Sequence, residues 1–237
     1  MRQTCRQAFA NSLTLNLSSS HLKQGLYIIL EGIDGTGKST VARLLAESLR
    51  AQGREVVLTG EPSDSPCGKL IRERLSDKKL KTTAQEWLGL FVADRRLHID
   101  NVVRPALEAG KVVIQDRSMY STLVYQGQMG IAEKDILARH AGWHPEPNLL
   151  VILDIAPRFG LARTAKRTRG LGQKWVKQEK QVYLFKDGDG PQTTEKLRFQ
   201  QGLRKRYAKI KGQNVLHLEV KELKPEQVRD AILAKLA

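Results

Sequence analysis

The chain has 237 residues, of which 41% are hydrophobic and 27% are charged. This length predicts a soluble globular protein of one large or two small domains, and no apolar run approaches the roughly 20 residues of a membrane span. The two cysteines, Cys5 and Cys67, exclude a disulfide framework and a cysteine-based metal cluster. They fit a reducing compartment, and we expect a cytoplasmic protein without a membrane partner.

The net charge of +15 is unevenly distributed along the chain. Residues 1–24 contribute +3, residues 25–157 are neutral, and residues 158–211 contribute +12. Such a basic segment suits either a protein that wraps along duplex nucleic acid or a kinase whose mobile segment closes over a triphosphate. A solvated basic helix face accounts for part of the charge in both cases.

Residues 1–24 are rich in Ser, Asn and Gln and contain no acidic residue. We expect them to form a disordered arm outside the folded domain, which we predict to span residues 25–237. A transit-type peptide and a wrongly assigned start are the alternatives, so targeting to an organelle stays open. Secretion is not expected, because no A-x-A-like cleavage site follows an apolar region.

From residue 25 onward, apolar strand patterns alternate with helical patterns. The predicted strands are residues 26–31, 55–59, 111–115, 149–153 and 215–219. The predicted helices are residues 38–52, 66–76, 83–108, 118–127, 132–141, 157–168, 195–211 and 225–236. This alternation predicts an α/β fold with a five-stranded parallel sheet and helices on both faces. Right-handed crossovers then place the ligand site at the carboxyl ends of the strands.

The first predicted strand leads into a phosphate-binding motif. Residues 32–39 match G-x-x-x-x-G-K-[ST] at every fixed position, and a helical pattern follows. Inward-facing N–H groups and the helix dipole make such a loop a triphosphate site, in which Lys38 reaches the β- and γ-phosphates and Ser39 ligates Mg²⁺. A glycine-rich turn that binds nothing is the alternative. The predicted ATP-binding residues are Gly32, Ile33, Asp34, Gly35, Thr36, Gly37, Lys38, Ser39 and Thr40.

Two later segments carry residues suited to a second ligand. A stiff, proline-containing loop at residues 60–66 follows the second strand and lies at the mouth of the predicted site. On the long helix, Phe91 and Arg95 are four residues apart and therefore share a face. A ring and a guanidinium on one face can stack on a base and hold its edge or a phosphate. For Phe91 alone, packing in the core is the simpler interpretation.

The third predicted strand ends in Asp116 and Arg117, and charged groups at the tip of a buried strand are costly unless they are used. Asp116 is placed to hold Mg²⁺ or one of its waters, and Arg117 to bind an acceptor phosphate through two N–H groups. A structural salt bridge is the alternative. Polar groups follow on the next helix, namely Ser121, Thr122, Tyr125 and Gln126.

A basic helix follows the fourth strand and leads into a long segment with weak periodicity. This helix offers Arg163 and Arg167, and Arg169 directly follows it, whereas the phosphate loop contains no arginine. A loose phosphoryl-transfer transition state spreads negative charge over the moving group. We therefore expect these arginines to supply a catalytic cation from a mobile lid at about residues 163–194, although a solvated face explains any single one of them.

This set of motifs resembles the thymidylate kinases, a family of P-loop nucleoside monophosphate kinases. The shared motifs cover residues 31–40, Glu61-Pro62, residues 91–95, Asp116-Arg117, residues 121–127, and Phe199 with Leu203, Arg204 and Tyr207. They occur in order and at family-like spacing between residues 26 and 236. The resemblance implies the three-layer P-loop kinase fold with a mobile lid.

The resemblance also implies a reaction, in which the γ-phosphate of ATP passes to dTMP and gives dTDP and ADP in the route to dTTP. It implies Mg²⁺ as cofactor and a homodimer built on helices. The dTMP-binding residues it implies are Asp34, Glu61, Arg72, Phe91, Arg95, Arg117, Ser121, Thr122, Tyr125 and Gln126. The implied catalytic residues are Lys38, Asp34, Arg117, Arg163, Arg167 and Arg169, and the implied metal ligands are Ser39 and Asp116.

The roles of individual residues also follow from the resemblance. Asp34 is expected to meet the sugar 3′-hydroxyl, Phe91 to stack on thymine, and Arg95 with Thr122 to contact the base and its surroundings. Arg117 and Arg72 are expected to hold the dTMP phosphate. Tyr125 is expected to lie under the deoxyribose and to disfavour a 2′-hydroxyl. The absence of an arginine from the phosphate loop resembles the bacterial subtype, which supplies this group from its lid.

The sequence departs from the family pattern at several positions. Gly60 precedes Glu-Pro where many bacterial members have Arg, Ser118 replaces a frequent Tyr, and Asn148 replaces the usual Asp. The lid motif Asp-Arg-[Ile/Phe]-Glu is missing, and residues 194–197 lie in its place. These departures concern the details of the lid more than the reaction.

Two other functions stay open at this point. The sequence at residues 116–121 also suits a deoxynucleoside kinase, which needs a carboxylate to take the proton of the sugar 5′-hydroxyl. A non-catalytic P-loop protein could instead use the basic segment to bind nucleic acid. The weakly periodic part of this segment, residues 169–194, has few aromatic residues, only Trp175, Tyr183 and Phe185, so base stacking has little support and a nucleic-acid partner is not expected.

Overall fold

The computed structural model describes residues 25–77, 80–170 and 194–236, with the side chains of 166–170 and 194–195 left out of the description. The strands are β1 (Leu26–Glu31), β2 (Val56–Gly60), β3 (Val112–Asp116), β4 (Leu149–Asp154) and β5 (Val215–Glu219). The helices are α2 (Lys38–Ala51), α3 (Pro66–Ser76), α4 (Ala84–His98), η1 (Ile99–Val103), α5 (Arg104–Glu108), α6 (Met119–Gln128), α7 (Glu133–His140), α8 (Pro157–Gly170), α9 (Thr194–Tyr207) and α10 (Pro225–Leu236).

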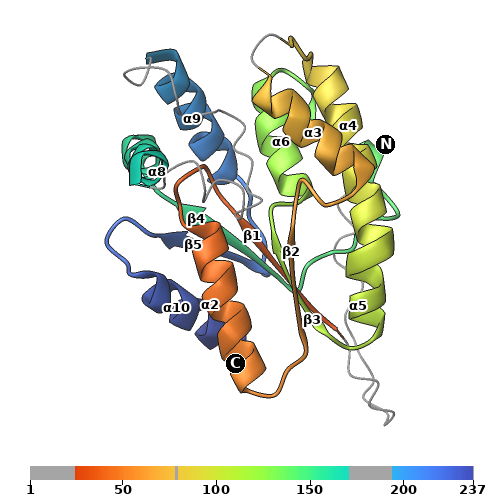
Figure 1. Ribbon diagram of the computed structural model, residues 1–237, viewed down its shortest axis with the longest axis vertical. Coiled ribbons are helices and arrows are strands. Elements are labelled where there is room, and N and C mark those ends of the chain that lie inside the picture. Colours follow the sequence, from red (N-terminus) through yellow and green to blue (C-terminus); the bar gives the residue numbers. More distant parts are fainter. Residues whose placement is uncertain (1–24, 78–79, 171–193, 237) are drawn as a thin grey trace, which may run out of the picture.

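The five strands form one parallel sheet in the order β2-β3-β1-β4-β5 (Figure 1). In the register of β1 and β3, Leu30 pairs with Asp116, so Glu31 at the end of β1 lies one position beyond the end of β3. The phosphate loop therefore begins next to the Asp116-Arg117 pair. The parallel sheet and its helical layers confirm the predicted fold class, and the strand ends lie within one residue of their predicted positions.

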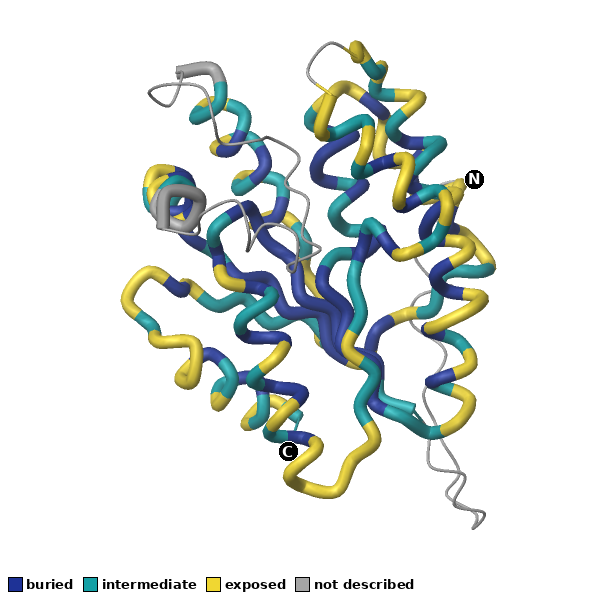
Figure 2. The backbone as a smooth tube through the Cα atoms, viewed as in Figure 1, coloured by how far each residue is buried: buried dark blue, intermediate teal, exposed yellow. Residues whose placement is uncertain are grey.

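Helices cover both faces of this sheet. Helices α2 and α10 lie together on one side, and the helical run from α4 to α5 lies on the other side with α6 (Figure 1). The strands form the buried centre of the molecule (Figure 2), and Ile28, Ile29 and Leu30 of β1 have no exposed side-chain surface. Two-sided burial explains why β1 is a continuous apolar run rather than an alternating pattern.

The long helix predicted at residues 83–108 contains a π-helical turn. Helix α4 begins at a capping box formed by Thr83 and Glu86, and passes directly into η1, where the Arg104 N–H donates to the Ile99 carbonyl five residues earlier. Pro105 follows within the first turn of α5. A proline ring clashes with the carbonyl four residues before it, and the wider turn relieves that clash while Ile99 and Val103 stay buried.

Some predictions fall on residues outside the description. The arm at residues 1–24 and positions 171–193 of the predicted lid are not described, so both stay predictions, as does the extent of the domain. Helix α8 contains the start of the predicted lid. In the described part of the chain, every helix is too short or too polar to cross a membrane.

Candidate active site

The phosphate loop curls around the side chain of Lys38. Gly35 and Gly37 have φ values of 82° and 92°, in the left-handed region that favours glycine. The Lys38 ammonium donates to the carbonyls of Gly32 and Ile33, both at 3.0 Å. Burial and the nearby Arg117 lower the pKa of Lys38 to about 8. The loop thus holds a single buried cation at the start of α2, where an anion is also favoured by the helix dipole.

Gly35 is required because helix α8 lies against the phosphate loop. A Cβ atom at Gly35 would lie 2.1 Å from the carbonyl oxygen of Gly160, and one at Gly160 would lie 2.5 Å from the carbonyl oxygen of Asp34. Neither position can carry a side chain without displacing the backbone of the facing segment. The loop therefore has no room for an arginine at position 35 while α8 keeps this place.

A cleft of about 280 Å³ lies on the outer side of the loop. Its walls come from residues 34–41 and from Arg163, Thr164, Val220, Leu223, Pro225 and Val228. The Arg163 guanidinium donates to the carbonyls of Val220 and Lys221 at 3.2 and 3.0 Å, which places it on the wall of this cleft. The other two predicted lid arginines, Arg167 and Arg169, lie on α8, and their side chains are outside the description.

The two predicted metal ligands lie together. The Ser39 hydroxyl donates to Asp116 Oδ2 at 2.9 Å, across the gap between the start of α2 and the end of β3. A hydroxyl and a carboxylate beside a phosphate loop are the oxygen donors that Mg²⁺ takes in P-loop enzymes, where substrate phosphates and waters complete its shell. The donor set therefore fits this ion.

Arg117 stands between the phosphate loop and a second pocket. Its φ of 71° is the only positive value of a non-glycine residue among the described positions. Its guanidinium forms an ion pair with Asp34 and donates to Ser121 Oγ at 3.3 Å. The same group lies 5.4 Å from the centre of the Tyr125 ring. Strained backbone at a cation between two clefts is typical of a functional position.

The second pocket gathers eight of the ten residues predicted to bind dTMP. It is lined by Glu61, Phe91, Arg95, Arg117, Ser121, Thr122, Tyr125 and Gln126, together with Pro62 and Leu75. The free volume between these side chains is only about 20 Å³, so a nucleotide requires them to move apart. Asp34 contacts the pocket through Arg117, and Arg72 lies on α3 and contacts the neighbouring proline-containing loop.

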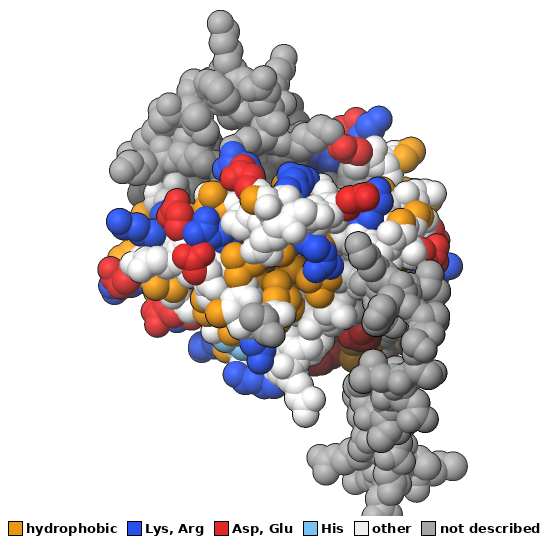
Figure 3. All heavy atoms as spheres, turned by 90° about the horizontal axis from the view of Figure 1, so that it is seen from below, with side chains coloured by type: hydrophobic (Ala, Val, Ile, Leu, Met, Phe, Trp, Pro, Cys, Tyr) orange, Lys and Arg blue, Asp and Glu red, His pale blue; other side chains and the backbone are white. Residues whose placement is uncertain are grey.

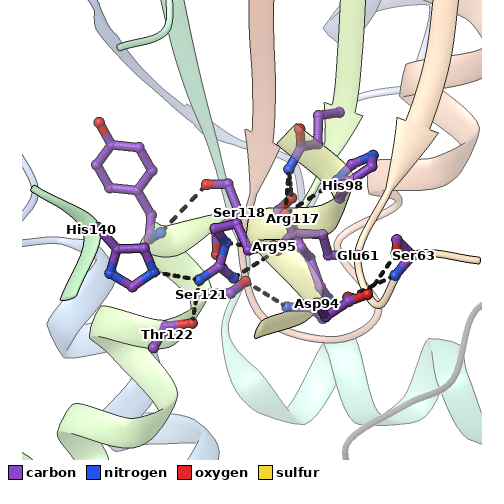
Figure 4. Close-up of polar contacts among 12 residues, drawn as sticks. Glu61, Ser63, Asp94, Arg95, His98, Arg117, Ser118, Ser121, Thr122 and His140 are labelled. Carbon is purple, nitrogen blue, oxygen red and sulfur yellow. Dashed lines mark hydrogen bonds and ion pairs between the residues drawn. The ribbon is translucent and has the colours of Figure 1, made fainter. Parts of the chain in front are cut away.

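Arg95 is held by a buried polar network at the base of this pocket (Figure 4). It is 1% exposed and pairs with Glu61 at 2.6 Å, while it also donates to Thr122 Oγ1 and to the Ser118 carbonyl. Burial raises the pKa of Glu61, but Arg95 and His98 outweigh it and hold that pKa at about 2. Glu61 is therefore a permanent counter-ion for Arg95 rather than a base.

The neighbouring residue Asp94 fixes the proline-containing loop. Its carboxylate is fully buried and accepts from the N–H of Ser63 at 2.8 Å and from the hydroxyls of Ser63 and Ser65 (Figure 4). Arg72 completes the arrangement by donating to the carbonyls of Pro62 and Ser63. Arg72, predicted to hold the acceptor phosphate, thus lies on α3 and stabilises the backbone of this loop in the present arrangement.

His140 accepts a hydrogen bond from Arg95. Its Nδ1 lies 2.7 Å from the Ile136 carbonyl and must donate to it, so Nε2 carries the lone pair and accepts from the Arg95 guanidinium at 2.8 Å. Burial and the charge of Arg95 lower the pKa of His140 to about 4. The ring is neutral at neutral pH and protonation would break the contact with Arg95.

This contact predicts a loss of stability in acid. Because the folded-state pKa of His140 is about 4, against about 6.5 in an unfolded chain, the stabilisation is complete above about pH 6.5 and is lost as the pH falls toward 4. At about 1.4 kcal/mol per pKa unit, the loss is on the order of 3 kcal/mol. Urea unfolding from about pH 7 to about pH 4 measures it.

A His140→Gln variant tests the assignment, since the amide keeps an acceptor for Arg95 but does not titrate. It should lose less stability over this pH range than the unmodified protein. Burial and the charge of Arg95 also lower the pKa of His144, to about 3, so part of the dependence of stability on pH should remain in this variant. His217→Gln, which changes a histidine on β5, is the control. An unchanged slope in His140→Gln would contradict the assignment.

Several residues of the site carried no predicted role. They are Glu31, Asp94, His98, Gln115, Ser118, His140 and Tyr207, all of them buried. One signal was present for Asp94, because it lies three residues after Phe91 and so falls on the buried face of α4. The contacts of Glu31 and His140 reach residues far along the chain, and no local spacing reports them.

Comparison with known proteins agrees with this geometry. The sequence model of the family described as Thymidylate kinase matches residues 30–232. The chain belongs to the thymidylate kinase family. The motifs of the sequence predicted this family.

Individual relatives in this family show the same likeness. A thymidylate kinase of Xanthomonas euvesicatoria is 43% identical over 143 residues, which cover 60% of this chain and 62% of the relative. One from Desulfotalea psychrophila is 42% identical over 139 residues, or 59% and 68% of the two chains. A probable thymidylate kinase of Pyrococcus abyssi is 40% identical over 148 residues, or 61% and 72%. In each comparison the matched part covers only part of this chain and only part of the relative.

Proposed function

We propose that this protein transfers the γ-phosphoryl group of ATP to dTMP and releases dTDP and ADP. The observation that carries the proposal is the position of Arg117, which lines both the cleft beside the phosphate loop and the pocket at Phe91 and Arg95. A guanidinium at this junction can hold an acceptor phosphate in line with a bound triphosphate. The family membership of the chain supports the same substrates.

We assign the donor nucleotide to the phosphate loop and the acceptor to the second pocket. Lys38 and the loop N–H groups hold the β- and γ-phosphates of ATP, and Phe91 stacks on the thymine ring. Arg95, with its partner Thr122, faces the base, and Tyr125 lies under the sugar. Ser39 and Asp116 hold Mg²⁺, which neutralises charge on the triphosphate when it is bound.

The chain needs no general base for this reaction. The attacking atom is an anionic phosphate oxygen, so catalysis rests on positioning and charge neutralisation. A deoxynucleoside kinase would need a carboxylate able to take a proton from a sugar hydroxyl. Glu61, the carboxylate that lines the second pocket, has a pKa held at about 2 by Arg95 and His98 and is a poor base. The structure thus favours a monophosphate acceptor.

A panel of acceptors tests the proposal. ADP formation is measured with ATP, Mg²⁺ and either dTMP, thymidine, dUMP, dCMP, dGMP or TMP with a ribose sugar. We expect the highest kcat/KM with dTMP, little activity with thymidine, and loss of activity when EDTA removes the metal. Turnover of thymidine above that of dTMP would instead identify a deoxynucleoside kinase.

The face of the molecule seen in Figure 3 gives little support to a nucleic-acid partner. On the face shown in Figure 3, acidic side chains are interspersed with basic ones around an apolar area, without a continuous basic stripe. The basic excess of the chain falls mainly within residues 158–211, which include positions outside the description. Salt-dependent binding to duplex DNA without turnover of dTMP would favour the nucleic-acid alternative.

We also propose that the protein is a homodimer. Leu58 is 41% exposed, and Leu97 and Val102 are each 38% exposed. These three apolar side chains line the same cleft of about 830 Å³. A shared apolar surface of this kind suits contact with a second copy. Light scattering after size exclusion should give twice the chain mass, and Leu97→Glu should shift it toward the monomer. A monomer for the unmodified protein at every concentration would contradict the proposal.

The proposal includes a cytoplasmic location, where ATP and nucleoside monophosphates are available. Cell fractionation with an antibody against the chain tests it. Recovery in a membrane or organelle fraction would contradict it and would draw attention to residues 1–24.

A further inference from the structure

We propose that Glu31 is a positioning residue for dTMP binding, which holds Arg117 in place and ties it to helix α9. The inference rests on the proposed function, because it assigns to Glu31 an effect on the acceptor nucleotide. Glu31 is the last residue of β1 and directly precedes the phosphate loop. Its side chain has no exposed surface and does not reach either nucleotide pocket.

The Glu31 carboxylate is saturated by five donors. Oε1 accepts from the N–H of Ser118 at 2.8 Å, from its hydroxyl at 3.1 Å and from the N–H of Ser121 at 3.0 Å. Oε2 accepts from the Ser121 hydroxyl at 2.7 Å and from the Tyr207 hydroxyl at 2.8 Å. An ionised carboxylate has about four lone-pair sites, so this side chain has no capacity left for a substrate.

All of these donors follow Arg117 in the chain, and Ser118 follows it directly. The peptide after Arg117 is fixed by Glu31, and the Arg117 N–H donates to the Leu30 carbonyl at 3.0 Å. The Arg117 carbonyl accepts from Gln115 Nε2 at 2.8 Å. A non-glycine residue keeps a left-handed conformation only where its surroundings impose it. Glu31 holds the peptide that follows Arg117, whereas the Leu30 carbonyl and Gln115 hold Arg117 itself. Together they aim the Arg117 guanidinium at the pocket.

Tyr207 extends the arrangement to α9. It is the last residue of that helix, and its hydroxyl also lies 3.3 Å from Ser121 Oγ. Three residues earlier, Arg204 forms a bidentate pair with Asp154 at 2.7 and 2.6 Å, which fixes α9 to the end of β4. Helix α9 is thus attached to the sheet at two charged points, and one of them is the group that orders Arg117.

Initial rates with each substrate varied in turn test the role of Glu31. The Glu31→Gln variant keeps the shape of the side chain. Its NH₂ group, however, replaces one of the two accepting oxygens and then faces N–H or O–H donors without being able to accept from them. We expect the KM for dTMP to rise about tenfold and the KM for ATP to stay within about twofold. A merely structural role would reduce the amount of active enzyme and leave both KM values unchanged.

Tyr207→Phe is the second variant. It removes the hydroxyl that donates to Glu31 and introduces no new polar group into the buried site. We expect it to raise the KM for dTMP about threefold. Its matched control is Tyr120→Phe, which loses a hydroxyl bonded to Glu146 rather than to Glu31 and should keep both KM values. Tyr207→Phe decides alone if Glu31→Gln does not fold.

The outcomes separate this inference from the proposed function. If the unmodified enzyme makes no dTDP, the proposed function fails and the inference fails with it. If the unmodified enzyme is active and both variants keep its KM for dTMP, the function stands and the inference is overturned. A selective rise in the KM for dTMP in both variants supports it.

Discussion

Replacing Lys38 with methionine is expected to lower kcat for dTDP formation at least about 10³-fold, with the fold retained. Methionine keeps the apolar stem of the side chain and removes only the ammonium group. That group is held by the Gly32 and Ile33 carbonyls at 3.0 Å, in the position where the triphosphate charge must be neutralised. Initial rates at saturating ATP and dTMP measure the effect.

The stability of this variant is a separate expectation. Burial and Arg117 already lower the pKa of Lys38 to about 8, which shows that the folded chain holds this charge at a cost. We therefore expect the thermal midpoint to change by only a few degrees. Lys134→Met, on the exposed side of α7, is the control and should keep full activity. Near-normal turnover in Lys38→Met would remove the proposed role of the phosphate loop.

Replacing Arg117 with alanine is expected to lower kcat/KM for dTMP about 10²- to 10³-fold. Among the described residues, Arg117 is the cation that lines both the cleft beside the phosphate loop and the second pocket. Alanine at this position offers no group that could replace its charged, bidentate contact with a phosphate. ATP binding should change little, because the loop around Lys38 keeps its own contacts. Isothermal titration with ATP alone and initial rates with dTMP separate the two effects.

Because Arg117 has a φ value of 71°, two substitutions at this position can be compared. Arg117→Gly removes the guanidinium and also the steric cost of the left-handed conformation, whereas Arg117→Ala removes only the guanidinium. The glycine variant should therefore unfold at a higher temperature than the alanine variant, and both should be equally inactive. Retention of dTMP turnover in either variant would assign the acceptor phosphate to another cation.

Much of this architecture was predictable because its signals are local. The run Leu26–Leu30 is apolar on both sides, so it predicts a buried parallel strand, and the glycines and lysine after it fix the phosphate loop. Asp116 ends the buried strand β3 and Arg117 follows it, and parallel strands bring their carboxyl ends together. The register of β1 and β3 then places both residues beside the loop without further information.

The remainder depends on contacts between residues that are distant in the sequence. Glu31 meets Ser118, Ser121 and Tyr207, which are 87 to 176 residues away, and nothing in its local sequence indicates these partners. His140 binds Arg95 from another helix for the same reason. The π-helical turn before Pro105 depends on the burial of Ile99 and Val103, which a helical pattern alone does not reveal.

The most direct test is to follow ATP, Mg²⁺ and dTMP with the purified protein by ³¹P NMR. The account predicts that dTDP and ADP appear together in equal amounts, and that neither appears with the Lys38→Met or the Arg117→Ala protein on the same timescale. Consumption of ATP without formation of dTDP, or no reaction with dTMP at all, would contradict it.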